Sequence, residues 1–342
     1  DCVGHDDLMV LMFTSGTTGR SKAVMLSERN FFTTVECQVK FGGAMLDYKH
    51  EHMPEDKNDV LSNFAILPLF HLGTFICLFV WACKGWALNL SADIRDFYRD
   101  LGLMHSDAIA VAPMLMEAIY KDVKRGRRAR LNGIWNPCGS SAMFDGAMLA
   151  ELARQGMMIT QVYGMTETCG DGIINYEQDE KHIRAVGKPD DHAEYKLDET
   201  GEICIRGGCV MLGYYKDPEA TAEVLDADGW FHTGDLARVD EDGFYYITGR
   251  KKNIIILDNG ENVSPEELEN LLSKCEAVKE CIVREKGKKI CAVIYCEEAK
   301  QEEVREYITA TNRTLPLYQR MSAVEFSTEP LPRTVTGKLL RK

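Results

Sequence analysis

The repeating order of short apolar runs and helical stretches is the feature that most constrains the fold of this 342-residue chain. Apolar runs at residues 63–67, 108–112 and 158–162 have the length and composition of buried strands. A helical stretch at residues 145–155 lies between the last two runs. Strands that alternate with helices are joined by crossover connections, which leave neighbouring strands parallel. The sequence therefore predicts an α/β fold with a mostly parallel sheet.

A further apolar run, residues 7–13, leads directly into a turn of glycines and hydroxyl side chains at residues 14–19. We expect this run to be a buried strand that ends in the turn. Backbone amides, hydroxyl groups and the following Lys22 can surround polyphosphate oxygens, and glycine allows a close approach. The segment is not a G-x-x-x-x-G-K-[ST] loop, because Ser21 stands where that pattern needs its second glycine. An exposed polar turn remains the alternative.

The pattern of the chain changes near residue 187. Short alternating runs bounded by glycines, at residues 201–207 and 243–249, predict a small antiparallel β subdomain. The elements expected from residue 250 onward are strands at residues 253–257, 280–283 and 290–296, a helix that begins at the cap Ser264-Pro265-Glu266-Glu267, and a helix at residues 302–311. We therefore expect an α/β core at residues 1–186, a β subdomain at 187–249 and a compact α+β domain at 250–342.

Composition excludes several classes of protein. Hydrophobic residues make up 45% of the chain and charged residues 27%, which is typical of a globular protein. A formal net charge of −13 argues against binding to nucleic acid. The longest strongly apolar run, residues 75–83, is shorter than the roughly 20 residues that span a bilayer. Six basic residues at 121–130 leave peripheral contact with a membrane open, although a solvated loop is the commoner explanation.

Twelve cysteines and eight histidines are scattered along the chain. They form no Cys-x-x-Cys pair and no regular framework of the kind that disulfide-rich domains use. Residues 1–7 lack the basic start and apolar core of a secretory leader. We therefore expect a protein of the reducing cytoplasm, with metal binding by cysteine and histidine as the weaker alternative.

Six segments, taken in order, resemble the signatures of the adenylate-forming superfamily, which includes acyl-CoA synthetases, luciferases and the adenylation domains of peptide synthetases. These segments are residues 13–25, 67–71, 163–168, 229–235, 249–252 and 332–338. Members of that superfamily carry a substantial region before the phosphate loop, so the resemblance also implies a chain truncated at its N-terminus.

The resemblance implies a site for ATP and Mg²⁺. It assigns the β- and γ-phosphates to Thr14, Ser15, Gly16, Thr17, Thr18, Gly19 and Lys22. Glu167 is the implied magnesium ligand, and Thr166 would contact the α-phosphate region. The implied adenine pocket is formed by Gly139, Ser140, Ser141, Tyr163 and Gly164.

The same resemblance gives roles to residues nearer the C-terminus. Asp235 and Arg250 would bind the ribose hydroxyls, Lys338 would bridge the attacking carboxylate and the α-phosphate, and Lys252 would be the hinge between two domains. From the residues alone, Asp235 is more often a turn cap and the two lysines are solvated surface charges. His71 is implied to line the acyl entrance, with a structural role as the alternative.

The implied activity is that of an ATP-dependent acyl-CoA synthetase acting on fatty acids, with coenzyme A as co-substrate. Amino-acid-adenylating relatives place an aspartate near residues 69–73, which hold no acidic residue here, so an acid without an α-amino group is expected. Two alternatives stay open. The acyl group could pass to the thiol of a carrier protein, or the chain could be a noncatalytic nucleotide-binding fragment.

Overall fold

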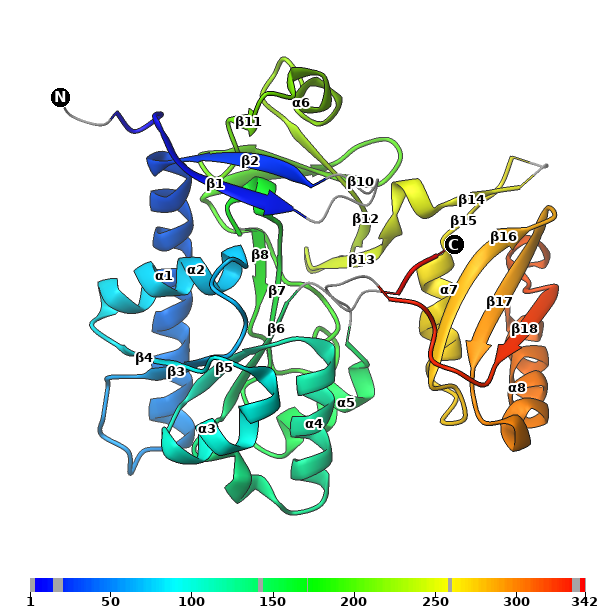
Figure 1. Ribbon diagram of the computed structural model, residues 1–342, viewed down its shortest axis with the longest axis horizontal. Coiled ribbons are helices and arrows are strands. Elements are labelled where there is room, and N and C mark those ends of the chain that lie inside the picture. The colour runs from blue at the N-terminus through cyan, green and yellow to red at the C-terminus, as the bar shows by residue number, and fades with distance from the viewer. Residues whose placement is uncertain are drawn as a thin grey trace. The chain divides into compact units, whose positions relative to one another are not determined.

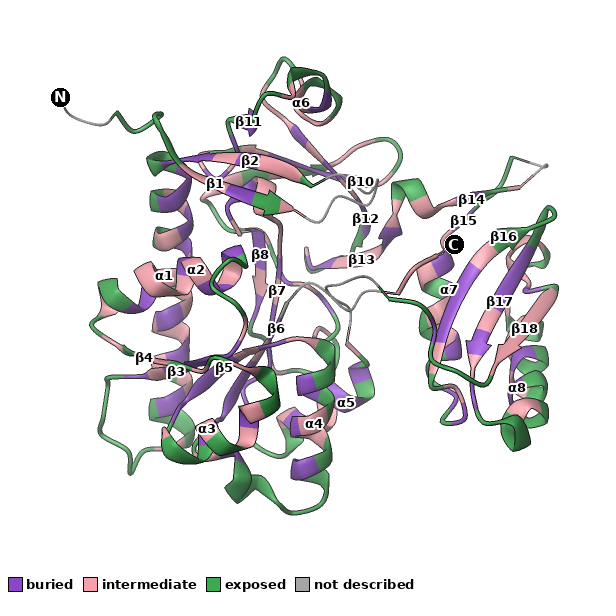
Figure 2. Ribbon diagram, in the orientation of Figure 1, coloured by how far each residue is buried: buried purple, intermediate pink, exposed green. Residues whose placement is uncertain are grey.

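A computed structural model of the chain describes residues 4–14, 21–140, 144–170, 172–257, 260–333 and 339–341, with Ser140 described by its backbone alone (Figure 1). Two compact units make up the chain. The first contains residues 1–197, 204–233 and 239–246, and the second contains residues 198–203, 234–238 and 247–342. Each unit encloses a cluster of buried apolar side chains of its own. Figure 2 marks the ribbon of the buried residues in purple.

A six-stranded sheet, in the order β4-β3-β5-β6-β7-β8, lies in the first unit. Strands β4 to β7 pair in parallel, and β8 pairs antiparallel with β7. The strands are β3 (Ser62–Ala65), β4 (Ala87–Leu90), β5 (Ala108–Val111), β6 (Asn136–Ser140), β7 (Thr160–Gly164) and β8 (Gly172–Asn175). The predicted mostly parallel sheet is therefore confirmed.

Helices connect the parallel strands of this sheet. They are α2 (Leu72–Lys84), α3 (Phe97–Leu103), α4 (Pro113–Lys124) and α5 (Gly146–Arg154). Leu101, Met116 and Leu149, one from each of α3, α4 and α5, are buried in the same cluster as Ile109 of β5. Helix α5 follows the prediction closely, because the Asp145 carboxylate caps it by accepting from the Met148 backbone N–H at 2.8 Å.

The apolar run at residues 75–83 lies within α2. This helix ends at Gly85, whose φ of 66° is the left-handed conformation that glycine adopts without strain. Among the described residues, no helix is both long enough and apolar enough to cross a membrane.

Strand β1 (Leu8–Thr14) departs from the sequence-based expectation. It is a strand, but it is the outer member of a separate three-stranded sheet, in which it pairs antiparallel with β2 (Lys22–Ser27), and β2 in turn pairs with β11 (Gly213–Tyr214). Phe13 is 69% exposed, and only Met12 of the strand is buried. The prediction of a buried strand was wrong because an apolar run does not distinguish a central strand from an edge strand.

The second unit contains an α+β arrangement around a three-stranded sheet. Strand β16 (Glu280–Lys286) pairs antiparallel with β17 (Lys289–Tyr295), which pairs in parallel with β18 (Ala323–Ser327). Helices α7 (Pro265–Leu272) and α8 (Gln301–Thr314) bury Leu268, Leu272, Val304 and Ile308 in the cluster that this sheet shares. The predicted strands at residues 280–283 and 290–296 and both predicted helices are present.

Two details of the second unit differ from the prediction. The strand expected at residues 253–257 is only β14 (Ile255–Ile256), paired with β15 (Asn262–Val263). Ser264 stands at the N-cap of α7, but its hydroxyl donates to the Thr248 carbonyl at 2.6 Å and makes no cap bond to the helix. A competing acceptor in the tertiary structure has replaced the local cap.

A further sheet, in the order β13-β12-β10-β9, contains the strands predicted at residues 201–207 and 243–249. Its members are β9 (Ala193–Leu197), β10 (Glu202–Gly207), β12 (Phe231–Val239) and β13 (Tyr245–Arg250).

One buried carboxylate joins the beginnings of three strands of the parallel sheet. Asp107, which precedes β5, accepts from the Trp135 indole N–H at 3.0 Å and from both the backbone N–H and the hydroxyl of Ser62 at 2.8 Å. Ser62 begins β3, and Trp135 immediately precedes β6. Asp107 thereby holds β3, β5 and β6 in register.

We expect Asp107→Ala to destabilise the first unit by about 2–4 kcal/mol, because it leaves buried donors without an acceptor. Urea unfolding followed by tryptophan fluorescence measures the loss. Asp47→Ala, on the exposed side of α1 (Glu28–His52), is the matched control and should change stability by about 0.5 kcal/mol or less. Equal midpoints for the two variants would contradict the proposed role of Asp107.

His182 is held between carboxylates and an aromatic ring. Its Nδ1 lies 2.9 Å from an Asp179 carboxylate oxygen and its Nε2 lies 3.1 Å from an Asp242 carboxylate oxygen. Its ring stacks on Phe244 with centroids 3.9 Å apart. The hydrogen bond to Asp179, followed by that to Asp242, raises the pKa of His182 above its usual value of 6.5, although desolvation opposes this shift.

Because the folded state raises this pKa, the stabilisation from His182 is fully present below about pH 6.5 and is lost as pH rises through the raised value. Thermal midpoints measured across this range should therefore fall more for the unmodified chain than for His182→Asn. His5→Asn, at an exposed position, should keep the steeper pH dependence. A slope that His182→Asn leaves unchanged would remove His182 as its source.

Candidate functional site

Two neighbouring strands of the parallel sheet bring part of the predicted adenine pocket to one edge. Gly139 and Ser140 end β6 and pair with β7, which itself ends at Tyr163 and Gly164. The carboxyl ends of neighbouring parallel strands meet at the same edge of a sheet, where ligands of α/β proteins bind. A Cβ on Gly139 would stand 2.4 Å from a ring carbon of Phe144, so the packing leaves no room for a larger residue there.

Glu167 follows β7 on a single turn of 3₁₀ helix, residues Thr166–Thr168. Its carboxylate is half-buried, and its Oε1 accepts from the Tyr214 hydroxyl at 2.9 Å. Its own backbone carbonyl accepts from the Met211 N–H at 2.9 Å. These two bonds connect the turn to residues 211–214 and fix the position of the carboxylate.

Tyr214 also contacts the predicted phosphate-binding lysine. The Lys22 ammonium nitrogen lies 4.4 Å from the centroid of the Tyr214 ring, within the range of a cation–π contact. Burial raises the pKa of the Tyr214 phenol, and the nearby Glu167 carboxylate raises it further. The phenol therefore stays protonated and can continue to donate to Glu167.

The two ends of the predicted phosphate loop lie side by side. Thr14 and Lys22 are paired across β1 and β2. The predicted phosphate contacts at residues 15–19 lie outside the described part of the chain, as do Ser141, Lys338 and the side chain of Ser140.

The donor chemistry of Glu167 fits a magnesium ion. Mg²⁺ binds carboxylate and phosphate oxygens in preference to nitrogen or sulfur. Glu167 offers a half-buried carboxylate whose orientation is set by Tyr214, which is the kind of support that metal ligands usually receive from neighbouring residues.

Within the second unit, the predicted ribose-binding residues are in contact. The Arg250 guanidinium forms an ion pair with the Asp235 carboxylate. The Asp235 side chain is 5% exposed and that of Arg250 is 42% exposed. These residues come from β12 and β13, which are neighbours in their sheet.

A second ion pair lies beside the predicted hinge. Lys251 Nζ lies 2.7 Å from Glu202 Oε2, and the other oxygen of this buried carboxylate accepts from the Gly234 N–H at 2.7 Å. The hydrogen bond to Glu202 raises the pKa of Lys251. Lys252, the predicted hinge, is exposed.

His71 lies at the N-cap of α2 and is exposed. Its place at the acyl entrance and the structural alternative both stay predictions. The His71 ring packs against Gly73: a Cβ on Gly73 would stand 3.3 Å from His71 Nδ1.

Tyr214 is the residue that sequence reasoning missed. It belongs to a strand of two residues and lies 47 positions from Glu167. A run this short has no period from which its partners could be deduced, so its role emerges only from the tertiary structure.

Family models match both halves of the chain. A model described as an AMP-binding enzyme matches residues 1–215, and one described as an AMP-binding enzyme C-terminal domain matches residues 252–342.

Curated relatives match nearly the whole chain. A feruloyl-CoA synthase of Amycolatopsis sp is 31% identical, and the match covers 99% of this chain and 70% of the relative. A long-chain-fatty-acid–CoA ligase of Salmonella typhimurium is 30% identical over 98% of this chain and 61% of the relative. A 4-coumarate–CoA ligase 3 of Oryza sativa is 29% identical, and the match covers 99% of this chain and 64% of the relative. The chain thus spans less than two thirds of the length of the last two relatives.

Solved structures with a similar fold also match nearly the whole chain. The O-succinylbenzoate coenzyme A synthetase of Bacillus subtilis, in complex with ATP and magnesium ion, has a TM-score of 0.80 and 25% identity over 99% of this chain and 70% of that one. ATP-bound MatB from Rhodopseudomonas palustris has a TM-score of 0.77 and 26% identity, and the match covers 98% of this chain and 67% of that one. From its sequence and its fold, the chain belongs to the family of AMP-binding enzymes.

Proposed function

We propose that this chain carries the activity of an AMP-forming acid–thiol ligase. In the first step a carboxylic acid displaces pyrophosphate from ATP and forms acyl-AMP. In the second, the thiol of coenzyme A displaces AMP and forms acyl-CoA. The observation that carries the proposal is the contact of Lys22 and Glu167 through Tyr214 in a member of the AMP-binding enzyme family.

The first step requires two anions to approach each other, and positioned cations and donors lower the cost of that approach. In our proposal, Lys22 and the turn at residues 14–19 hold the β- and γ-phosphates. A bound Mg²⁺ would neutralise phosphate charge. Glu167 would hold that ion, and Tyr214 keeps the Glu167 carboxylate in place for it.

The remaining predicted contacts belong to the same proposal. Thr166 contacts the α-phosphate region, and the adenine pocket is formed by Gly139, Ser140, Ser141, Tyr163 and Gly164. Asp235 accepts from the ribose hydroxyls while Arg250 donates to them, which is the hydrogen-bonding capacity of a carboxylate and a guanidinium.

The division into a core at residues 1–186, a β subdomain at 187–249 and a mobile domain at 250–342 is also proposed. Rotation at Lys252 would exchange Lys338, used in adenylation, for the segment around residues 259–262, used in thiolysis.

Two classes of acid are candidates. We propose a fatty acid as the substrate, which the long-chain-fatty-acid–CoA ligase among the relatives supports, with His71 at the acyl entrance. The second candidate is an aromatic acid, which the 4-coumarate and feruloyl relatives favour.

The test is pyrophosphate release by the purified chain with ATP and Mg²⁺. The acids to compare are octanoate, palmitate, benzoate, 4-coumarate, ferulate and a mixture of amino acids, with coenzyme A present or withheld. Acyl-CoA formed from one class of acid supports the proposal and identifies the class. Acyl-AMP that no coenzyme A consumes would point to a carrier-protein thiol, and ATP binding with no pyrophosphate released would point to a noncatalytic nucleotide-binding chain.

We expect Lys338→Ala to slow acyl-AMP formation by about 100-fold or more, because it removes a positive charge from the developing transition state. Thiolysis of supplied acyl-AMP should stay within about threefold of the unmodified rate, since Lys338 acts in the first step only. Lys274→Ala, at an exposed position in the same unit, is the control and should affect neither step. Equal losses of rate in both steps would contradict a role for Lys338 in acyl-AMP formation alone.

We expect Tyr214→Phe to raise the Mg²⁺ concentration for half-maximal turnover by about 10- to 100-fold, because Glu167 loses the donor that orients it. Tyr215→Phe, at the exposed neighbouring residue, is the matched control. A magnesium titration of both variants at saturating ATP makes the comparison. An unchanged titration for Tyr214→Phe would mean that Tyr214 does not support a magnesium ligand.

A further inference from the structure

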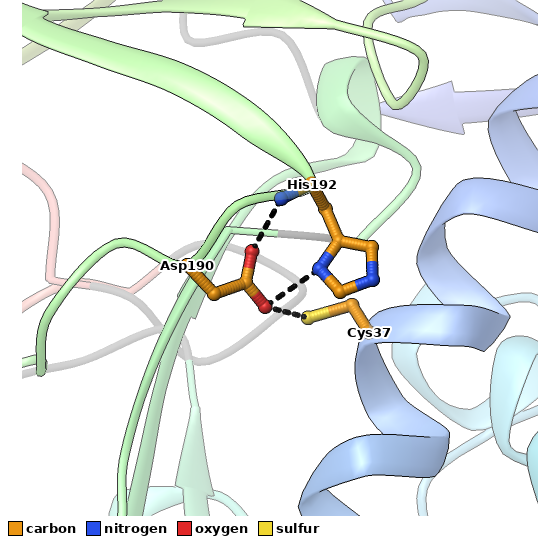
Figure 3. Close-up of side chains that lie close together, drawn as sticks. All are labelled: Cys37, Asp190 and His192. Carbon is orange, nitrogen blue, oxygen red and sulfur yellow. Dashed lines mark hydrogen bonds and ion pairs between the residues drawn. The ribbon is translucent and has the colours of Figure 1, made fainter.

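A cysteine, an aspartate and a histidine converge in the first unit, and the proposed ligase activity uses none of them (Figure 3). Cys37 lies on α1, while Asp190 and His192 lie in the segment just before β9. Cys37 Sγ is 3.1 Å from Asp190 Oδ2, and His192 Nδ1 is 2.8 Å from the same oxygen. Figure 3 shows the thiol and the imidazole ring next to the same oxygen of this carboxylate.

The spacing of the three groups suits a tetrahedral metal ion. One ligand atom from each residue lies within 4.8 Å of the other two. With metal–ligand bonds of about 2.0–2.3 Å, tetrahedral zinc holds its ligand atoms about 3.3–3.7 Å apart. Small rotations of these side chains would open the two observed distances to that range.

His192 gives an independent indication of a ligand. Its side chain is 10% exposed, and its Nδ1 is buried with no hydrogen-bond partner among the described residues. The nitrogen is close to Asp190 Oδ2, but the direction is not that of a hydrogen bond. A proton or a metal ion between this nitrogen and the carboxylate oxygen removes the repulsion between their lone pairs.

The protein fixes these groups in advance. The Asp190 carboxylate also accepts from the His192 backbone N–H at 2.9 Å, which shapes the segment locally. One helical turn beyond Cys37, Lys40 forms an ion pair with Asp191 at 2.7 Å and ties the segment to α1. A site whose ligands are held in place loses little entropy when a metal binds.

We propose that Cys37, Asp190 and His192 bind a zinc ion, with water in the fourth position. Thiolate, imidazole and carboxylate are ligands that zinc accepts together, whereas Mg²⁺ and Ca²⁺ prefer a shell made of oxygen alone. On binding, the Cys37 thiol releases its proton to solvent and its sulfur bonds the metal. The thiolate and carboxylate together neutralise the charge of Zn²⁺, which favours the ion in this half-buried place.

The sequence could not indicate this site. Cys37 and Asp190 are 153 positions apart, so they lack the short paired spacing of the usual zinc motifs. Metal binding was the weaker alternative from the sequence. The fold now supports it, because it brings these three residues together. The bound ion would connect α1 to the segment before β9, and this proposal does not depend on the ligase activity.

The experiment loads the purified, chelator-treated full chain with Co²⁺ and with Zn²⁺. A thiolate bonded to Co²⁺ gives an intense charge-transfer absorption, so the unmodified chain should show it and Cys37→Ser should lose it. Cys83→Ser, at an exposed cysteine, should retain the band. Asp190→Asn and Asp47→Asn form the second matched pair, since Asp47 is exposed on the helix that carries Cys37. Only Asp190→Asn should weaken zinc binding, by about 10-fold or more.

Zinc should also raise the thermal midpoint of the unmodified chain, because it binds the folded state, and should not raise that of His192→Gln. This second readout decides the matter if Cys37→Ser fails to fold. The proposal is overturned if the cobalt band is absent, if Cys37→Ser and Cys83→Ser bind alike, or if zinc stabilises His192→Gln as much as the unmodified chain. In those cases the three residues form an ion pair with a neighbouring thiol only.

Discussion

The Asp107 carboxylate sets the register on which the rest of the first unit depends. It joins the beginnings of β3, β5 and β6, and Asn136 continues the connection by donating to the Met158 carbonyl and the Thr160 hydroxyl at the start of β7. The parallel pairing carries this register to the carboxyl ends, where Ser140 of β6 pairs with Val162 of β7. The turn that carries Glu167 therefore emerges beside the end of β6, and the candidate site inherits its geometry from hydrogen bonds at the opposite edge of the sheet.

The candidate site shows how a neutral group can organise charged ones. Tyr214 contacts Lys22 through its ring and Glu167 through its hydroxyl, so one side chain relates a cation and an anion that come from distant parts of the chain. Its raised pKa follows from the same contacts, since burial and the nearby carboxylate both oppose loss of the phenolic proton. The Asp235–Arg250 pair in the second unit is different, because there two charges meet directly.

The sequence predicted what depends on local pattern. The parallel sheet, the helix capped by Asp145 and the strands of the second unit all follow from period and capping residues. The sequence-based predictions failed where the tertiary structure decides which residues a strand or side chain contacts. An edge position left β1 exposed, and Thr248 drew the Ser264 hydroxyl away from the helix that it was expected to cap. Tyr214 and the group formed by Cys37, Asp190 and His192 join segments that nothing in their neighbouring residues relates.

In our proposal that the chain bends at Lys252, the ion pair between Lys251 and the buried Glu202 carboxylate fixes the residue before the hinge. A rotation about Lys252 needs a fixed residue beside it. Lys251 would be that residue, because moving it would leave the buried Glu202 carboxylate without its cation. Torsion at Lys252 would then be transmitted forward along the chain and not backward. The fixed position of Lys251 would then give a rotation at Lys252 a reproducible axis.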